Sequence, residues 1–350
     1  MKNFTYGPLA ATAVLALALS ACSGNPPAPA STGGAGDSKQ LSIAYSVNGA
    51  LGDQGFIDDA QSGIKKLGAN GHKTTTLQSD ATNPAQWKAN LESLSTGSWD
   101  VVIAGSTQMT DIITAAAKKF SDQHYILFDD VAKAPNVASV TYKQNEGSFL
   151  AGVLAGLATT DTGTFPLSKG GKTVGVVGGM DVPVINDFVV GFKAGVGAVD
   201  PGIKVLVSYV GSFADSAKGY DQTKGMFSNG ADVVFQVAGG SGIGVLQAAK
   251  DANKYAIGVD SNQNALQPGY VLASMLKRIG NSLVLAVQAA QQGTLKYGEE
   301  IQYGLANDGV GLDFENNSNL VPQAVIDKID SYKKKVISGD IKVPTVTSGH

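Results

Sequence analysis

The sequence contains few of the residues on which disulfides, metal sites and nucleophilic catalysis depend. Its 350 residues include one cysteine, Cys22, and three histidines that lie far apart along the chain. A single cysteine excludes an intramolecular disulfide. Scattered histidines give little material for a metal site or a Ser-His-Asp triad. We therefore expect no metal, no cofactor and no enzymatic activity.

Charged residues are also scarce, at 16% of the chain, and their balance is slightly acidic. Without Lys2, which lies in the leader described below, 25 of the 26 basic residues remain against 29 acidic ones, a net charge of −4. This chain has no basic field for nucleic acid, so we expect no nucleic-acid partner. Arg278 is the only arginine. Because guanidinium groups are the usual clamps for phosphates and carboxylates, their near absence favours a neutral ligand.

Residues 1–21 have the pattern of a lipoprotein signal peptide. Lys2 precedes an Ala- and Leu-rich run over residues 8–19, which is short for a membrane span and ends in Leu19-Ser20-Ala21-Cys22. We expect lipidation of Cys22, which would anchor the chain to the cell membrane on its extracytoplasmic face. The alternative is an ordinary cleaved signal with an incidental cysteine. Residues 22–39, rich in Pro, Gly, Ala and Ser, are expected to form a flexible tether.

Residues 41–67 combine a strand, a polar turn and a helix. An apolar run breaks at Asn48, a turn containing Asp53 follows, and apolar residues then recur at helical spacing. In a parallel α/β sheet such a turn lies at the carboxyl end of its strand, where small molecules bind. Phe56, at the mouth of the turn, is placed to present its ring to a flat ligand. The alternative is that Phe56 is the first core residue of its helix.

Strands and helices alternate through the rest of the chain, which predicts an α/β fold with parallel sheets. Two consecutive series of similar size predict two doubly wound lobes, and the last ninety residues are expected to return to both through several crossings. We assign residues 40–143 plus about 265–315 to the N-terminal lobe, and 144–264 plus about 316–350 to the C-terminal lobe. The expected strands cover residues 41–47, 72–77, 101–104, 125–128, 174–177, 205–209, 233–237, 256–259, 271–277 and 301–304. The expected helices after the first cover residues 84–94, 110–120, 146–157, 185–199, 216–229, 242–252, 280–291 and 322–338.

Two glycine-rich segments are similar to nucleotide-binding motifs without completing them. Residues 170–173 (GGKT) lack the first glycine of a phosphate-binding loop and precede a strand instead of following one. Residues 240–244 (GSGIG) follow a strand and precede Asp260, but they lack the third glycine of a dinucleotide fingerprint. The second segment still lets the backbone approach a ligand at the strand ends.

Segments spread between residues 42 and 344 resemble those of the basic-membrane-protein (BMP, or PnrA-like) family of nucleoside-binding lipoproteins, which are substrate-binding components of ABC transporters. Their order and spacing carry the resemblance. It implies a type I periplasmic-binding-protein fold, with two lobes joined by a multi-crossover hinge. The matching segments are GDQGFIDDAQSG at 52–63, LFDDV at 127–131, NEGSFLAGVLAG at 145–156, VGVVGGMDVPVINDFVVGFKAGV at 174–196, GSFADSAKG at 211–219, ADVVFQVAGGSGIGV at 231–245, IGVDSNQ at 257–263 and VLASMLKRIG at 271–280.

The resemblance also implies a ligand site between the lobes. The base would lie between two aromatic rings, matched here by Phe56 and Phe213. An acidic residue and a lysine, matched by Asp260 and Lys277, would hold the ribose hydroxyls through charge-assisted hydrogen bonds. The alternatives are that Phe213 is a core residue and that the charged groups form surface salt bridges.

Three further positions follow from the same match. Gly239 and Gly240 would let the backbone approach the sugar, and Asp129 would face the base edge. The alternative for Asp129 is a solvated strand end.

The sequence departs from the family pattern at the base. Val47 and Ile57 occupy positions where family members often carry aspartate and asparagine, which would weaken base recognition and leaves purine preference open. Asp58, Asn48 or Trp87 are candidates for replacement contacts.

We therefore expect a monomeric, membrane-anchored binding protein that closes on a nucleoside and delivers it to an ABC permease. Three alternatives remain open from the sequence. The ligand is a sugar or another small polar molecule, the protein is an exported nucleoside-acting enzyme or dehydrogenase, or it is a surface adhesin or signalling lipoprotein.

Overall fold

The computed structural model describes residues 39–346. The predicted signal peptide, Cys22 and nearly all of the predicted tether therefore lie outside the described residues. No helix between residues 39 and 346 combines the length and hydropathy needed to cross a bilayer.

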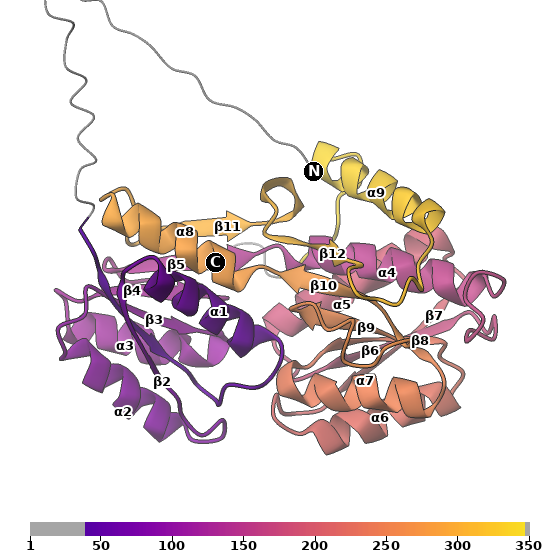
Figure 1. Cartoon of the computed structure of the whole chain (residues 1–350), viewed down its shortest axis with the longest axis horizontal. Coiled ribbons are helices and arrows are strands. Elements are labelled where there is room, and N and C mark those ends of the chain that lie inside the picture. Colours follow the sequence, from indigo (N-terminus) through magenta and orange to yellow (C-terminus); the bar gives the residue numbers. More distant parts are fainter. Residues whose placement is uncertain (1–38, 347–350) are drawn as a thin grey trace, which may run out of the picture. The chain divides into compact units, whose positions relative to one another are not determined.

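The first lobe is built on a six-stranded parallel sheet in the order β11-β5-β4-β3-β1-β2 (Figure 1). Strands β3 and β4 are buried along most of their length, as their apolar runs predict for strands covered on both faces. The strands of this sheet are β1 (Ser42–Ser46), β2 (Lys73–Leu77), β3 (Val101–Gly105), β4 (His124–Phe128), β5 (Val137–Tyr142) and β11 (Glu300–Tyr303). Its helices are α1 (Phe56–Ala69), α2 (Pro84–Ser95), α3 (Thr110–Lys119) and α8 (Ile279–Gln291), with the short 3₁₀ helix η1 (Thr107–Met109).

The second lobe repeats this plan with a sheet in the order β12-β10-β9-β8-β6-β7, in which only the β10–β12 pair is antiparallel. Its strands are β6 (Thr173–Gly178), β7 (Lys204–Tyr209), β8 (Val233–Val237), β9 (Tyr255–Asp260), β10 (Val271–Lys277) and β12 (Val310–Asp313). Its helices are α4 (Gln144–Thr160), α5 (Pro183–Val199), α6 (Ser216–Ser228), α7 (Gly242–Asp251) and α9 (Gln323–Ser338), with 3₁₀ helices η2 (Gly239–Ser241) and η3 (Leu305–Asn307) in the loops.

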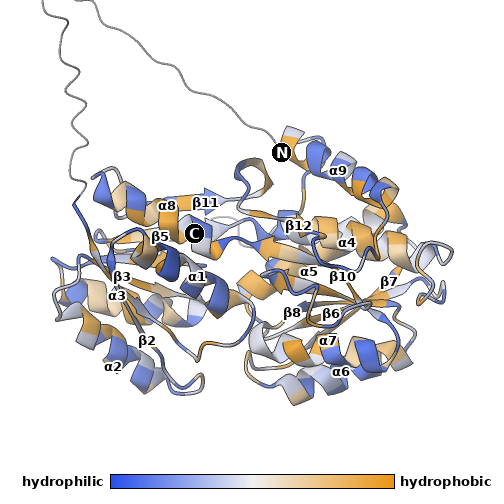
Figure 2. Cartoon of the chain, viewed as in Figure 1, coloured by the Kyte–Doolittle hydropathy of each residue, from blue (hydrophilic) through white to orange (hydrophobic). Residues whose placement is uncertain are grey.

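The two doubly wound α/β lobes are confirmed, and most expected strands and helices lie within a few residues of their predicted bounds. Figure 2 shows why hydrophobic patterning predicted these elements: apolar residues concentrate on the strands, while α1, α2, α6 and α9 also carry polar residues. Helix α4 differs, since 15 of its 17 residues are buried. Two strands had no counterpart in the prediction, β5 and β12.

The assignment of residues 265–315 to the first lobe is wrong for two strands. β10 pairs with β9, and β12 pairs with β10, so both belong to the second sheet. Only α8, which packs on α1, and β11, which pairs with β5, join the first lobe. The physical reason is that β10 is buried along nearly all of its length, and its place between β9 and β12 pairs the backbone groups of both its edges while α4 packs against it. The chain therefore crosses between the lobes near residues 142–144, 277–279 and 303–310.

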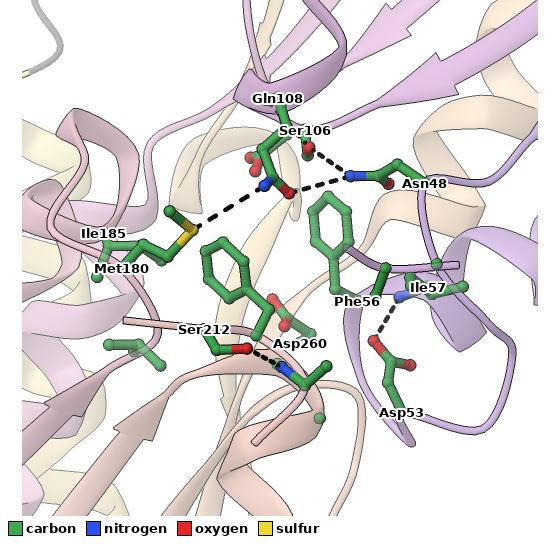
Figure 3. Close-up of a pocket in the computed structure, with 18 of the residues that line it drawn as sticks. Asn48, Asp53, Phe56, Ile57, Ser106, Gln108, Met180, Ile185, Ser212 and Asp260 are labelled. Carbon is green, nitrogen blue, oxygen red and sulfur yellow. Dashed lines mark hydrogen bonds between the residues drawn. The ribbon is translucent and has the colours of Figure 1, made fainter. Parts of the chain in front are cut away.

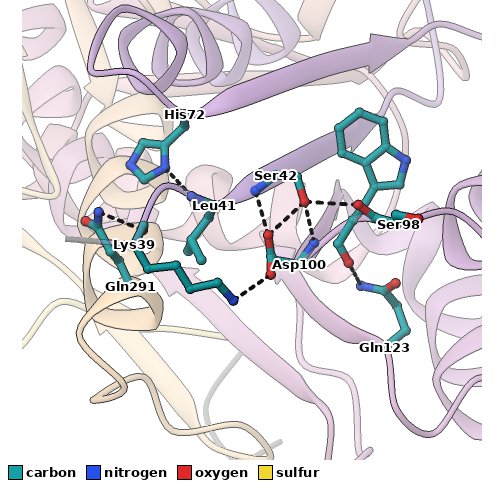
Figure 4. Close-up of polar contacts among 9 residues, drawn as sticks. Lys39, Leu41, Ser42, His72, Ser98, Asp100, Gln123 and Gln291 are labelled. Atoms are coloured by element: carbon teal, nitrogen blue, oxygen red, sulfur yellow. Dashed lines mark hydrogen bonds and ion pairs between the residues drawn. The ribbon is translucent and has the colours of Figure 1, made fainter. Parts of the chain in front are cut away.

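Polar contacts secure the start of the first lobe (Figure 4). The Asp100 carboxylate accepts hydrogen bonds from the Ser42 backbone N–H and hydroxyl, both at 2.8 Å, and forms an ion pair with Lys39. His72 Nδ1 accepts a hydrogen bond from the Leu41 N–H. His72 therefore fixes the residue that immediately precedes β1.

Candidate functional site

A cavity of about 480 Å³ lies where the carboxyl ends of the strands of both lobes meet. Its volume is within the range of about 300–1,000 Å³ that is usual for small-molecule sites. Eight of the nine residues predicted to bind ligand line it: Asn48, Phe56, Asp129, Phe213, Gly239, Gly240, Asp260 and Lys277. Cys22, the predicted lipidation site, lies outside the described residues.

Phe56 reaches the cavity because it is the first residue of α1. The Asp53 carboxylate accepts hydrogen bonds from the backbone N–H groups of Gly55, Ile57 and Asp58, at 2.9–3.1 Å, and so caps the first turn of the helix. The Phe56 ring is half-buried and packs against the buried Phe128 ring with centroids 5.4 Å apart. One face of Phe56 is thus supported by the core while the residue also lines the cavity.

Phe213 lines the cavity from the second lobe, in the loop after β7. Its half-buried ring lies so close to Gly179 that a Cβ at that glycine would overlap it. Gly239, with φ +56°, also approaches the Phe213 side chain. Each lobe thus contributes at least one aromatic ring to the same cavity.

Charged groups gather at the ends of β4, β9 and β10. Lys277, almost completely buried, forms an ion pair with Asp129 of the other lobe. Its ammonium also lies 5.6, 5.1 and 5.3 Å from the ring centroids of Phe56, Tyr142 and Phe188. The ion pair was not anticipated, because Asp129 was expected at the base edge and Lys277 at the ribose.

Asp260 is the second buried carboxylate of this group. Burial raises its pKa to about 8, and the nearby Lys277 ammonium opposes that rise. Asp129 and Asp260 both have φ in the left-handed region, at +70° and +64°. This conformation is uncommon for residues other than glycine and is associated with functional sites.

Asp58 does not line the cavity. Its carboxylate accepts hydrogen bonds from the backbone N–H groups of Gly52 and Gln54, both at 2.9 Å, so it stabilises the turn before α1. Trp87 is a core residue whose indole N–H donates to the Asp80 carbonyl. Of the three candidates for replacement base contacts, Asn48 alone lies at the cavity.

The two departures from the family pattern are placed differently. Val47 is fully buried in the hydrophobic core and does not line the cavity. Ile57 lines the cavity and contributes an apolar surface there.

Sequence reasoning missed polar cavity residues that follow β3, chiefly Ser106 and Gln108. The available signal was their position immediately after a buried strand next to β1 in the sheet. Met180 and Phe188 of the second lobe were missed as well, and they add an apolar wall. Across residues 39–346, no group of three or more His, Cys, Asp or Glu side chains is arranged to hold a metal ion.

Comparison with known proteins identifies the same family that the sequence segments resemble. Residues 40–347 match the family described as ABC transporter substrate-binding protein PnrA-like. The chain is 34% identical over 331 residues to the CD4+ T-cell-stimulating antigen of Listeria monocytogenes, covering 88% of this chain and 89% of that protein. It is 30% identical over 329 residues to the ABC transporter nucleoside-binding protein BmpA of Lactococcus lactis, covering 87% and 89% of the two chains.

Solved structures show the shared fold. A solute-binding protein of an ABC transporter system from Aeropyrum pernix K1 superposes with a TM-score of 0.78 at 22% identity, covering 89% of this chain and 94% of the other. The fold is therefore that of the periplasmic binding proteins. With a family match across nearly all of the described residues, the chain belongs to the PnrA-like family of ABC transporter substrate-binding proteins.

Proposed function

We propose that this protein binds a nucleoside in the cavity between its lobes and presents it to an ABC permease. The observation that carries the proposal is that Phe56 and Phe213, one from each lobe, line a single cavity that also contains the buried Asp260. This combination suits a ligand with a flat apolar ring at one end and hydroxyl groups at the other.

Membership of the family makes the chain the substrate-binding component of an ABC transporter, which implies a small-molecule ligand and a permease partner. The nucleoside itself is proposed on chemical grounds. Stacking of a base on an aromatic ring contributes about 1–3 kcal/mol per base in single-strand nucleic-acid binders. The Asp260 carboxyl group lines the cavity and can bond sugar hydroxyls, and Gly239 and Gly240 present backbone without a side chain at the same cavity, which supports the proposal. The relative named as a nucleoside-binding protein supports this choice.

Isothermal titration with a panel of nucleosides tests the proposal. We expect at least one nucleoside to bind, and Phe56→Ala and Phe213→Ala each to weaken it by about 5- to 150-fold, the loss of one stacking contact. Phe120→Ala is the matched control, because Phe120 is also half-buried but does not line the cavity.

Two results would contradict the proposal. One is unchanged affinity in both cavity variants, which would remove the base from between the rings. The other is free D-ribose binding as tightly as any nucleoside, which would make the protein a sugar-binding protein. Conversion of the nucleoside during titration would instead indicate an enzyme.

We also propose that residues 1–21 are removed as a signal peptide and that Cys22 carries the lipid that anchors the protein outside the cytoplasm. The pattern Leu19-Ser20-Ala21-Cys22 supports this proposal. The mass of the N-terminal peptide of the mature protein checks it, and an unmodified Cys22 would reject it.

A further inference from the structure

After α9 the chain turns back and continues as residues 339–346, which we call the C-terminal strap. Gly339 makes the turn with φ +83°, and the Ile341 N–H then donates to the Lys335 carbonyl at 3.0 Å. Ile341 and Val343 are partly buried and pack against the main hydrophobic core. The strap therefore lies against the rest of the protein instead of extending away from it.

Asp187, a completely buried residue of α5, holds the end of the strap. Its Oδ1 accepts hydrogen bonds from the Thr345 hydroxyl at 2.6 Å and from the Val346 N–H at 3.0 Å. Its Oδ2 accepts from the Gln144 side-chain amide at 2.9 Å. Among residues 39–346 no ion pair involves Asp187. The buried carboxylate thus depends on hydrogen bonds, and two of these three come from the strap.

The same contacts fix the first crossing between the lobes. β5 ends at Tyr142 and α4 begins at Gln144, so movement of the lobes changes the backbone between these two residues. Gln144 is bound to Asp187, and Asn145 Nδ2 donates to two carbonyls of the strap, at 3.4 and 3.1 Å. The strap therefore fixes both residues that follow the crossing, one directly and one through Asp187.

A second, smaller cavity lies between the strap and the first lobe. Its volume is about 200 Å³, and strap residues and first-lobe strands both line it. The lining residues are Val343 and Thr345 of the strap, Tyr142 of β5, Gln302 of β11, and Lys143, Asn145 and Glu146 at the crossing. Because the strap is bound to α5 of the second lobe, movement of the first lobe changes this gap.

Helix α5 connects the strap with the ligand cavity. Ile185 and Phe188, close to Asp187 on the same helix, line that cavity, and Figure 3 shows Ile185 there. Helix α5 also packs closely on the start of α4, since a Cβ at Gly191 would overlap the backbone of Asn145. A strap that fixes Asp187 and Asn145 therefore fixes one wall of the ligand cavity relative to the crossing.

We propose that the C-terminal strap is a latch on the hinge, which favours the closed arrangement of the lobes. In this arrangement the lobes are in contact beside the ligand cavity, where Lys277 of one lobe pairs with Asp129 of the other. When the strap detaches, Asp187 loses two hydrogen bonds and must be hydrated or protonated. Gln144 and Asn145 are then held less firmly, so the crossing bends more freely and open arrangements gain population. The inference goes beyond the proposed function, because it concerns the ligand-free protein.

Hydrogen exchange of the ligand-free full chain tests the contact between strap and hinge. Thr345→Val keeps the shape of the side chain and removes the hydroxyl that donates to Asp187. Loss of one hydrogen bond to a charged group should speed exchange of the strap amides by about 10- to 150-fold. Exchange at residues 143–146, where Lys143 N–H donates to the Tyr303 carbonyl, should rise by at least about threefold.

Thr162→Val is the matched control, because this exposed threonine of the second lobe is not among the residues that bind the strap. It should leave exchange unchanged in both segments. Faster exchange in the strap alone would show that the strap does not act on the hinge, and would overturn the proposal. Equal acceleration by Thr162→Val would indicate general loosening and would overturn it too.

A pair of substitutions at Asp187 tests the opening of the lobes by small-angle X-ray scattering. Asp187→Leu removes every acceptor for the strap, so the radius of gyration of the ligand-free protein should increase. Asp187→Asn keeps one acceptor oxygen for the strap. Its new amide can donate to Gln144 Oε1, which is buried and has no partner among the described residues, once the Gln144 amide turns over. The radius of gyration of this variant should stay at the wild-type value.

The two variants separate the latch from the effect of charge, since both remove the carboxylate. Equal radii for Asp187→Leu and Asp187→Asn would overturn the proposal, as would a folded Asp187→Leu protein with the wild-type radius. Thermal unfolding checks that each variant is folded, and if Asp187→Leu is not, the exchange experiment on Thr345→Val decides. None of these measurements uses a nucleoside, so their outcome is independent of the proposed function.

Discussion

Asp260 lowers the free energy of unfolding at a position where we propose that the ligand binds. Burial raises the pKa of its carboxyl group to about 8 against an ordinary value of 3.8, with Lys277 lowering it and Asp129, Asp53 and Asp59 raising it further. Between these two pKa values the folded protein holds a proton that the unfolded chain has released. The free energy of unfolding therefore falls as the pH rises through this window. The carboxyl group that lowers the stability of the folded protein lies where we propose that it bonds the sugar hydroxyls of the ligand.

We predict that Asp260→Asn removes this pH dependence in the ligand-free protein. Relative to the variant, the wild-type protein should lose on the order of 2–4 kcal/mol of unfolding free energy between pH 5 and pH 8.5. Urea unfolding at the two pH values measures the difference. Asp330→Asn, at an exposed position, is the control and should follow the wild type. Parallel pH profiles for wild type and Asp260→Asn would contradict the prediction.

At the scale of elements, helices α4 and α5 pack through glycines. A Cβ on Gly195 would overlap the carbonyl oxygen of Phe149, and one on Gly152 would overlap that of Phe192. The backbones approach each other closely because neither helix has a side chain at these positions. The pair packs against strands of the second sheet, among them β6, β8 and β10, so its spacing affects strands that end at the cavity.

Gly195→Ala should therefore lower the free energy of unfolding by about 1–3 kcal/mol, because the added methyl group forces the helices apart. Gly197→Ala is a close control on the same helix. Nothing lies within 4 Å of a Cβ at this exposed glycine, so alanine should stabilise the protein by up to about 1 kcal/mol. Chemical denaturation measures both changes, and equal effects of the two substitutions would rule out the packing explanation.

At the scale of the whole molecule, contacts between the lobes add to the three chain crossings. The Gln263 side-chain amide donates to the Gln54 carbonyl at 3.0 Å, and the Ser261 hydroxyl donates to the Gly55 carbonyl at 3.3 Å. These bonds lie next to Phe56 and Asp260, so the arrangement of the lobes and the geometry of the cavity are coupled. A ligand that contacts both lobes stabilises this arrangement over any other.

We accordingly expect a bound nucleoside to raise the midpoint of thermal unfolding. At a free concentration 100 times its Kd the ligand adds about 2.7 kcal/mol, which corresponds to a rise of about 4–8 °C in a chain of this size. Differential scanning calorimetry measures the rise. It should shrink in Phe213→Ala at the same nucleoside concentration and persist in Phe120→Ala. A midpoint that does not respond to a nucleoside shown to bind would contradict the coupling.

From local sequence pattern alone, Phe56 was predictable as a site residue, whereas Asp129, Phe213, Asp260 and Lys277 were named only through the resemblance to the family. Their convergence has a simple structural reason. Phe56 comes after β1, Asp129 after β4 and Asp260 ends β9, and parallel strands bring their carboxyl ends to one edge. Ser106 and Gln108 obey the same rule but were missed, because nothing local distinguishes them from ordinary loop residues. Both bond to Asn48, which is adjacent only because β1 and β3 are neighbours in the sheet.

The amino-acid sequence by itself determined the alternation of strands and helices, the two α/β series and the strand ends at which polar groups gather, since these follow from local hydrophobic periodicity. Only the tertiary structure decided that β10 and β12 join the second sheet, that Lys277 pairs with Asp129, and that Asp58 holds a turn. The strand pairing and the Lys277–Asp129 ion pair depend on which distant segment lies alongside, and hydrophobic periodicity does not encode that choice. The bonds from Gly52 and Gln54 to Asp58 depend on the backbone conformation of the turn, which hydrophobic periodicity does not encode either.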